Sequence, residues 1–270
     1  MCEYLSKHRL WAENALTKKL KDSVTDKQAA LELLRALMPL PADLQTAETV
    51  LQSGALDRTE IAIIAFAYVD YCFNFYHGLY LEDLSKEERF KLLHNPDPSL
   101  DTRFPGADMP EVFLLLLRYG LDPNAVFEGE TLIDSVVGCC NGYAAADTVQ
   151  VLLDHGADPL LKQEGEETAY EALEFDIIFG AFNQSKRRFY DSWIHCWLVL
   201  IAHLHNEHNG KEIVTVYSRQ RCDCELPDFK IEDFKNHRNY GFCLTNVPGN
   251  GENWSLHIFD RRTGWEVARL

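Results

Sequence analysis

The sequence predicts a mainly α-helical repeat solenoid with a small C-terminal antiparallel β unit, and three observations lead to this fold class. A leucine-rich phrase that ends in glycine, aspartate and proline occurs twice, 36 residues apart. Helical 3,4 spacing of apolar residues surrounds both copies, and the last sixty residues change to strand patterns. A period of roughly 20 to 50 residues is typical of stacked repeats, which leave a long surface open to a partner.

The repeated phrase predicts a helix that ends in a glycine turn and continues into a loop. Its copies span residues 116–123 and 152–159. We expect Gly120 and Gly156 to end the two helices, because a residue with positive φ costs least as glycine. The Asp-Pro pair that follows each glycine region is expected to turn the chain outward.

Helix starts are expected ahead of both copies. Asp108 followed by Pro110 predicts the first start, because an aspartate can accept from free N–H groups and a proline in the first turn needs none. Asp147 is expected to cap the helix of the second copy in the same way.

These residues resemble the ankyrin repeat. Its closing pattern, Leu-Leu-x-x-Gly-Ala-Asp, is complete over 152–158, and the first copy has Leu121 in the place of alanine. Its opening threonine is present at Thr131 and Thr168, without the usual proline and histidine. The chain therefore resembles a divergent ankyrin repeat family protein, clearly over residues 109–180. The resemblance implies helix pairs and partner binding through the loops that join them.

Three regions are expected along the chain. Residues 1–108 form an N-terminal helical region, either degenerate repeats or an unrelated helical cap, with helices at 3–21, 27–38, 46–53, 61–75 and 86–94. Residues 109–210 form the ankyrin-like repeats, which include later helices at 168–179 and 191–206. Residues 211–270 form a small β unit packed on the last helices, with strands at 213–217, 241–245, 254–259 and 265–268.

Composition favours a folded cytoplasmic protein. Hydrophobic residues make up 46% of the chain, the first twenty residues lack an apolar stretch, and the longest apolar run, 193–204, is too short to cross a membrane. Eight scattered cysteines in a chain of 270 residues do not form a disulfide framework of the secreted kind. We therefore expect a reducing cytoplasm and no membrane partner.

Negative charge is concentrated in the repeat region. The net charge is −16, and residues 109–210 alone hold 16 acidic and 5 basic residues, a net of −11. Such a field repels nucleic-acid phosphates and attracts basic partners. The plain alternative is that the charge serves solubility, as it does in many acidic proteins.

The loops after the two glycine turns are the candidate partner-binding site. They span residues 122–130 and 158–167, and the ankyrin resemblance places the partner against them. The binding residues expected there are Asp122, Phe127, Glu128, Glu130, Asp158, Lys162, Glu164 and Glu166. Phe127 is expected to act as an exposed aromatic anchor among carboxylates. The alternative is that Phe127 folds back onto the helices.

Other chemistry-bearing residues have weaker patterns. Cys222, Cys224, His237 and Cys243 are of the types that bind zinc, but C-x-C lacks the usual ligand spacing, and such cysteines are more often small hydrophobic residues. His195 adjoins Cys196, yet adjacent residues on a helix do not face one another. The chain has no glycine-rich phosphate loop and no serine elbow. We therefore expect neither a cofactor nor a resident metal.

The hypothesis that follows is a non-enzymatic protein–protein interaction module. Acidic residues on the loops and the concave face would select a basic protein, and divergent acidic ankyrin proteins of this size resemble immunity proteins that neutralise basic toxins. The alternative is a metal-binding protein or enzyme with its site in the C-terminal β unit. The chain is expected to be a monomer, or a weak homodimer through the free edge of the β hairpin.

Overall fold

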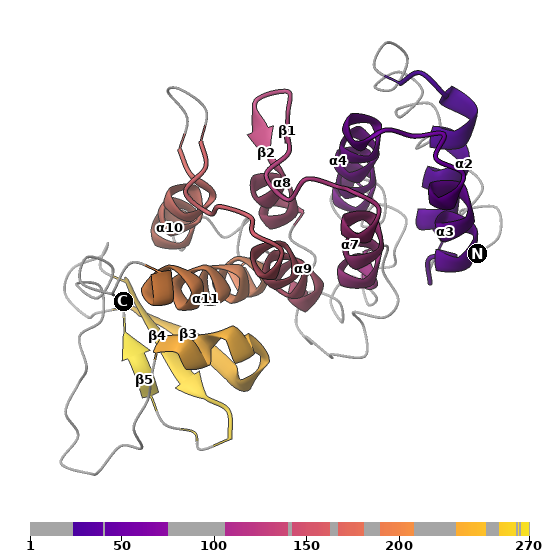
Figure 1. Cartoon of the computed structure of the whole chain (residues 1–270). Coiled ribbons are helices and arrows are strands. Elements are labelled where there is room, and N and C mark those ends of the chain that lie inside the picture. Colours follow the sequence, from indigo (N-terminus) through magenta and orange to yellow (C-terminus); the bar gives the residue numbers. More distant parts are fainter. Residues whose placement is uncertain are drawn as a thin grey trace.

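The chain is mainly helical and carries a small antiparallel sheet, which confirms the coarse fold class (Figure 1). The computed structural model describes residues 24–39, 41–74, 106–139, 142–162, 167–180, 190–207, 231–246, 254–262, 264 and 266–269. The expected helices at 3–21 and 86–94 and the expected strand at 213–217 lie outside these residues.

Within the described residues 24–39 and 41–74, the chain forms the helices α2 (Lys27–Leu37), α3 (Leu44–Gln52) and α4 (Arg58–Asn74). The first two begin at an aspartate whose carboxylate accepts from backbone N–H groups of the first turn. Helix α4 is apolar on almost all sides, and nearly all of its middle residues are buried, from Ile61 to Val69. It therefore lies within the core, as its composition predicts.

Six of the described helices form two rows. Helices α4, α8 (Leu132–Gly138) and α10 (Ala169–Gly180) lie side by side, and α7 (Met109–Arg118), α9 (Gly142–Asp154) and α11 (Tyr190–Glu207) form the second row beside them (Figure 1). Apolar faces of both rows meet in one continuous core. Each fully buried leucine or isoleucine there contributes about 1.5–3 kcal/mol of hydrophobic stabilisation.

Two aspartates predicted as helix caps have other partners. Asp108 stands at the N-cap position of α7, but its carboxylate accepts from the Ala42 N–H and from the Tyr68 hydroxyl, and it makes no capping bond. Asp147 lies inside α9, which begins five residues earlier at Gly142. The prediction of Asp147 as a cap was wrong, because three preceding alanines extend the helix and a distant segment takes up the carboxylate.

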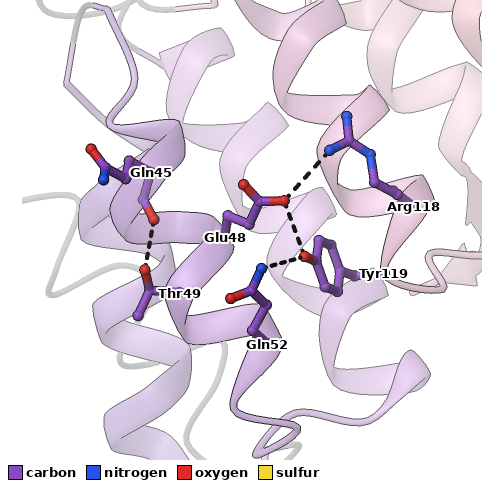
Figure 2. A network of polar contacts seen from close by, with 6 residues as sticks. All are labelled: Gln45, Glu48, Thr49, Gln52, Arg118 and Tyr119. Atoms are coloured by element: carbon purple, nitrogen blue, oxygen red, sulfur yellow. Dashed lines mark hydrogen bonds and ion pairs between the residues drawn. The ribbon is translucent and has the colours of Figure 1, made fainter.

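A polar network joins α3 to the end of α7 on the surface (Figure 2). The Tyr119 hydroxyl donates to Glu48 Oε1 at 3.1 Å and accepts from Gln52 Nε2 at 3.1 Å. Arg118 also reaches Glu48, at 3.5 Å. This network connects elements separated by about 70 residues of sequence. It holds the last turn of α7, where the first repeated phrase begins, against α3.

The C-terminal unit consists of a 3₁₀ helix and a three-stranded antiparallel sheet. The helix η5 (Ile231–Asn239) packs on α11, and the strands β3 (Tyr240–Asn246), β4 (Trp254–Asp260) and β5 (Glu266–Arg269) follow in the order β3-β4-β5 (Figure 1). Phe234 and Tyr240 meet edge to face and are fully buried at the junction. The predicted later strands and their hairpin are confirmed, and the contact with α11 is made by η5.

Candidate functional site

The first loop is a short β hairpin. Strands β1 (Val126–Phe127) and β2 (Glu130–Thr131) pair in antiparallel register, with Phe127 opposite Glu130. Two residues close the hairpin, and both have positive φ: 53° at Glu128 and 93° at Gly129. Positive φ at both positions is the signature of a type I′ turn, whose twist matches that of the two strands.

The second loop repeats the hydrogen bonds of the first at its start. The Asp122 carboxylate accepts from the Asn124 N–H at 2.9 Å, and the Asp158 carboxylate accepts from the Leu160 N–H at the same distance. Such aspartate turns fix the exit from each glycine turn. The repeated sequence therefore forms the same aspartate turn at the start of both loops.

Asn124 joins the two loops to each other. Its side-chain N–H donates to the carbonyl oxygen of Gly156 at 3.0 Å, and its side-chain oxygen accepts from the Asp158 N–H at 2.7 Å. One amide group thus satisfies two backbone groups of the next loop. The two loops are held as one surface, with a fixed spacing between their first residues.

Each loop leads into a helix that opens with a reciprocal cap. Thr131 and Asp134 exchange side-chain-to-backbone hydrogen bonds at the start of α8. Thr168 and Glu171 do the same at the start of α10. Capping boxes of this kind stop the loop and start the helix at a defined residue, so both ends of each loop are fixed.

The described part of the two loops exposes far more carboxylates than amines. The exposed acidic residues there and at the α10 start are Asp122, Glu128, Glu130, Asp158, Glu167 and Glu171. Lys162 is the basic residue that the structure describes in these loops, and its Nζ lies 3.4 Å from Glu171 Oε2. Glu164 and Glu166, expected in the site, lie outside the described residues. The described surface is therefore strongly negative.

Phe127 faces the helices. Its ring lies 5.7 Å from the ring of Phe66 on α4, and the side chain is only partly exposed. This position agrees with the alternative in which Phe127 folds back onto the helices, and not with an exposed aromatic anchor. Its neighbour Val126 is the exposed apolar residue of the hairpin, at 40%. Alternation along a strand sends these two side chains to opposite faces.

A second polar cluster, which the sequence did not reveal, lies where η5 meets α9 and α11. His237 Nε2 lies 2.9 Å from Asp147 Oδ1, and Arg238 also pairs with Asp147. The rings of His195 and His237 are 5.2 Å apart, and Tyr143 packs against both. No spacing rule in the sequence pairs His237 with Asp147, which are 90 positions apart. The one local sign of this cluster was an aspartate, Asp147, within an otherwise apolar helical segment.

Burial governs the chemistry of this cluster. The His195 side chain is 1% exposed, and burial lowers its pKa from 6.5 to about 3, with His237 and Arg261 adding to the effect. The neighbouring backbone of His237 partly opposes that shift. His237 and Arg238 together hold the pKa of the Asp147 carboxyl below its usual value against the opposing effect of burial. At neutral pH the cluster thus holds a neutral His195 and an ionised Asp147, and His237 contacts both.

The predicted metal ligands do not come together in the part of the chain that the structure describes. His237 bonds Asp147, Cys243 is exposed on β3, and Cys222 and Cys224 lie outside the described residues. Within the described ranges, no three metal-ligating side chains form a group. Cys196 is buried on the same helix as His195, and a buried thiol in apolar surroundings is typically unreactive.

No helix of the described segments is long and apolar enough to cross a membrane.

Comparison with known proteins gives no relative. No protein-family model matches the chain, and no curated protein and no solved structure matches it.

Proposed function

We propose that this protein is a non-enzymatic protein-binding module that captures a basic partner through its two loops and the adjoining row of helices. One observation carries the proposal: Asn124 locks two neighbouring loops together, and these loops expose carboxylates while their described lysine is paired with Glu171. In this proposal the two rows of helices are an ankyrin-like solenoid, which the recurring glycine turns and caps support.

The hydrogen bonds at the described ends of the loops favour binding. Both loops are held by such bonds at their start and at their end, and Asn124 joins the first residues of one to the other. A preformed surface loses little conformational entropy on association, so more of the contact energy is available as affinity. Excess negative charge accelerates encounter with a basic protein and makes the rate fall with ionic strength.

The mode of action within this proposal is occlusion or scaffolding. A basic protein held against the loops would have its functional surface covered. An immunity-type inhibitor of a basic toxin is the sharper form of the same hypothesis, because it also requires a rigid acidic surface and no chemistry of its own.

Affinity capture with paired charge variants tests the proposal. The full chain is immobilised and exposed to lysate of the native cell, beside the loop variant Glu130→Lys with Glu167→Lys. A matched variant, Glu32→Lys with Glu111→Lys, makes the same change of charge on exposed residues of α2 and α7.

The expected result is one stoichiometric basic protein that the wild type and the matched variant retain and the loop variant loses. Equal loss in both variants would indicate attraction by net charge alone. Retention of the partner in all three samples would show that it binds to a surface other than the loops.

A further inference from the structure

The junction between the C-terminal unit and the helices places two buried histidines side by side. His195 lies on α11 and His237 on η5, and their ring centroids are 5.2 Å apart in an edge-to-face arrangement. The two residues are 1% and 3% exposed, and η5 packs closely on α11 along this junction. The two imidazoles are therefore part of the surface through which the C-terminal unit docks on the helices.

Positively charged side chains surround this pair of rings. The guanidinium carbons of Arg238 and Arg261 lie 4.9 and 5.9 Å from the centroid of the Tyr143 ring. The same tyrosine ring packs edge to face on His195, at 4.7 Å between centroids. Both guanidiniums act on His195 through their charge and disfavour its protonated form.

The carboxylate of the cluster is bonded by groups other than His195. Asp147 Oδ1 lies 2.9 Å from His237 Nε2, and the other oxygen of Asp147 pairs with Arg238. Within the described ranges, neither ring nitrogen of His195 makes a hydrogen bond of good geometry, although the backbone of His237 lies close enough to favour the protonated ring. A protonated His195 would thus be a buried cation beside two arginines, which is unfavourable as long as the junction stays closed.

We propose that His195 and His237 form an acid-sensitive latch: protonation of His195 releases η5 and the strands after it from α9 and α11, while the helices of both rows stay folded. This inference concerns the C-terminal unit and is independent of the loop surface proposed above. The docked state keeps His195 neutral and away from water, whereas undocking lets the ring take up a proton in solvent. Opening of the junction is therefore coupled to proton uptake.

The direction and size of the effect follow from the two environments of the His195 ring. In the docked state burial, with the charges of His237 and Arg261, lowers the pKa of His195 from 6.5 to about 3. The docked state is fully favoured above pH 6.5 and loses this advantage as the pH falls toward 3. Between pH 7 and pH 5 the equilibrium constant for opening should rise about 25-fold.

Hydrogen exchange followed by mass spectrometry tests the latch on the full-length protein at pH 7 and pH 5. Protection in η5 is compared with protection in α4, after each exchange rate is divided by the intrinsic rate at that pH. His195→Phe and His195→Gln both remove the titrating group, and circular dichroism shows which of them keeps the helix content of the wild type. His155→Phe, at an exposed position, is the matched control.

Between pH 7 and pH 5, protection in η5 should fall about 25-fold more in the wild type and in His155→Phe than in the His195 variants. At both pH values the amides of η5 should also exchange at least about tenfold faster than those of α4, because the junction opens without unfolding of the helices.

Two outcomes overturn the inference. An equal fall in the wild type and in a folded His195 variant would show that another group controls the junction. Equal protection of η5 and α4 in the wild type would show that the C-terminal unit leaves the helices only when the whole chain unfolds. The second comparison needs no variant, so it decides the question even where neither substitution at 195 folds.

Discussion

The side-chain oxygen of Asn124 accepts a hydrogen bond from the backbone N–H of Asp158, at 2.7 Å and across 34 residues of sequence. The same side chain donates to the carbonyl of Gly156 at 3.0 Å. This pair of bonds makes the spacing of the two loops depend on a single amide group. In the second loop the corresponding position holds Leu160, which is 41% exposed.

Replacing Asn124 tests this dependence. Asn124→Ala removes both bonds and should lower the free energy of unfolding by about 1–2 kcal/mol. Hydrogen exchange at the Asp158 amide should become faster by a larger factor than exchange in the core helices. Leu160→Ala is the matched control, and it should leave exchange at Asp158 unchanged. Urea denaturation and exchange measured by NMR give both quantities.

Three glycine substitutions should differ in size and sign. Gly120→Ala and Gly156→Ala place a side chain at a φ of 99° and 90°, respectively. Each should lower the free energy of unfolding by about 1–2 kcal/mol. Gly120→Ala should be the worse, because its methyl group would lie 3.2 Å from the Arg58 side chain, whereas Gly156 has open space. Gly138→Ala, in the last position of α8 and in open space, should stabilise by about 0.5–1 kcal/mol. Equal effects at Gly120 and Gly156 would contradict the Arg58 contact.

Burial of His195 gives stability a dependence on pH. Its pKa falls from 6.5 in the unfolded chain to about 3 in the folded protein, so between these values only the unfolded chain binds the proton. The stabilising contribution is complete above pH 6.5 and is lost as the pH falls toward 3. From pH 7 to pH 5 it should decrease by about 2 kcal/mol.

The His195→Phe variant measures that contribution. Between pH 7 and pH 5, its free energy of unfolding should fall by about 2 kcal/mol less than that of the wild type. His155→Phe, on an exposed residue, should follow the wild-type curve. Parallel curves for all three proteins would show that His195 carries no such linkage.

The network of Figure 2 predicts unequal contributions from neighbouring residues. Tyr119→Phe removes the hydroxyl that bonds Glu48 and Gln52, and it should destabilise by about 0.5–1 kcal/mol because the bonds are partly solvated. Arg118→Ala should have an effect below about 0.5 kcal/mol, since its ion pair is long and its side chain 65% exposed. A larger effect from Arg118 in thermal denaturation would contradict this ranking.

Periodicity predicted the helices and the C-terminal strands well, because burial of one face imposes the same spacing whatever the tertiary partner is. The helix 61–75 corresponds to α4, and the strand 241–245 to β3, each within a few residues. Long-range pairing was the part that could not be predicted. Asp147 has the residue type of a cap, and only the approach of η5 from 90 residues away gives it another role.

The candidate site shows the same division. Loop boundaries followed from the glycines and from Thr131 and Thr168, which are local signals. The inward position of Phe127 depends on Phe66, 61 residues earlier, and no local pattern encodes it. Asn124 directly follows the first copy of the phrase, and leucine follows the second; that difference was the available signal for the bond between the loops.

The bonds of Asn124 to residues 32 and 34 positions later also limit the lengths of insertion that this fold can accept. Asp122 and Asp158 occupy corresponding positions and make the same turn. A gene in which residues 121–156 are duplicated would therefore offer every inserted asparagine a glycine carbonyl and an aspartate N–H at the usual offset. Lengthening by whole 36-residue segments would preserve the spacing between adjacent loops, whereas an insertion of any other length between Asn124 and Gly156 would have to be absorbed before the next loop begins.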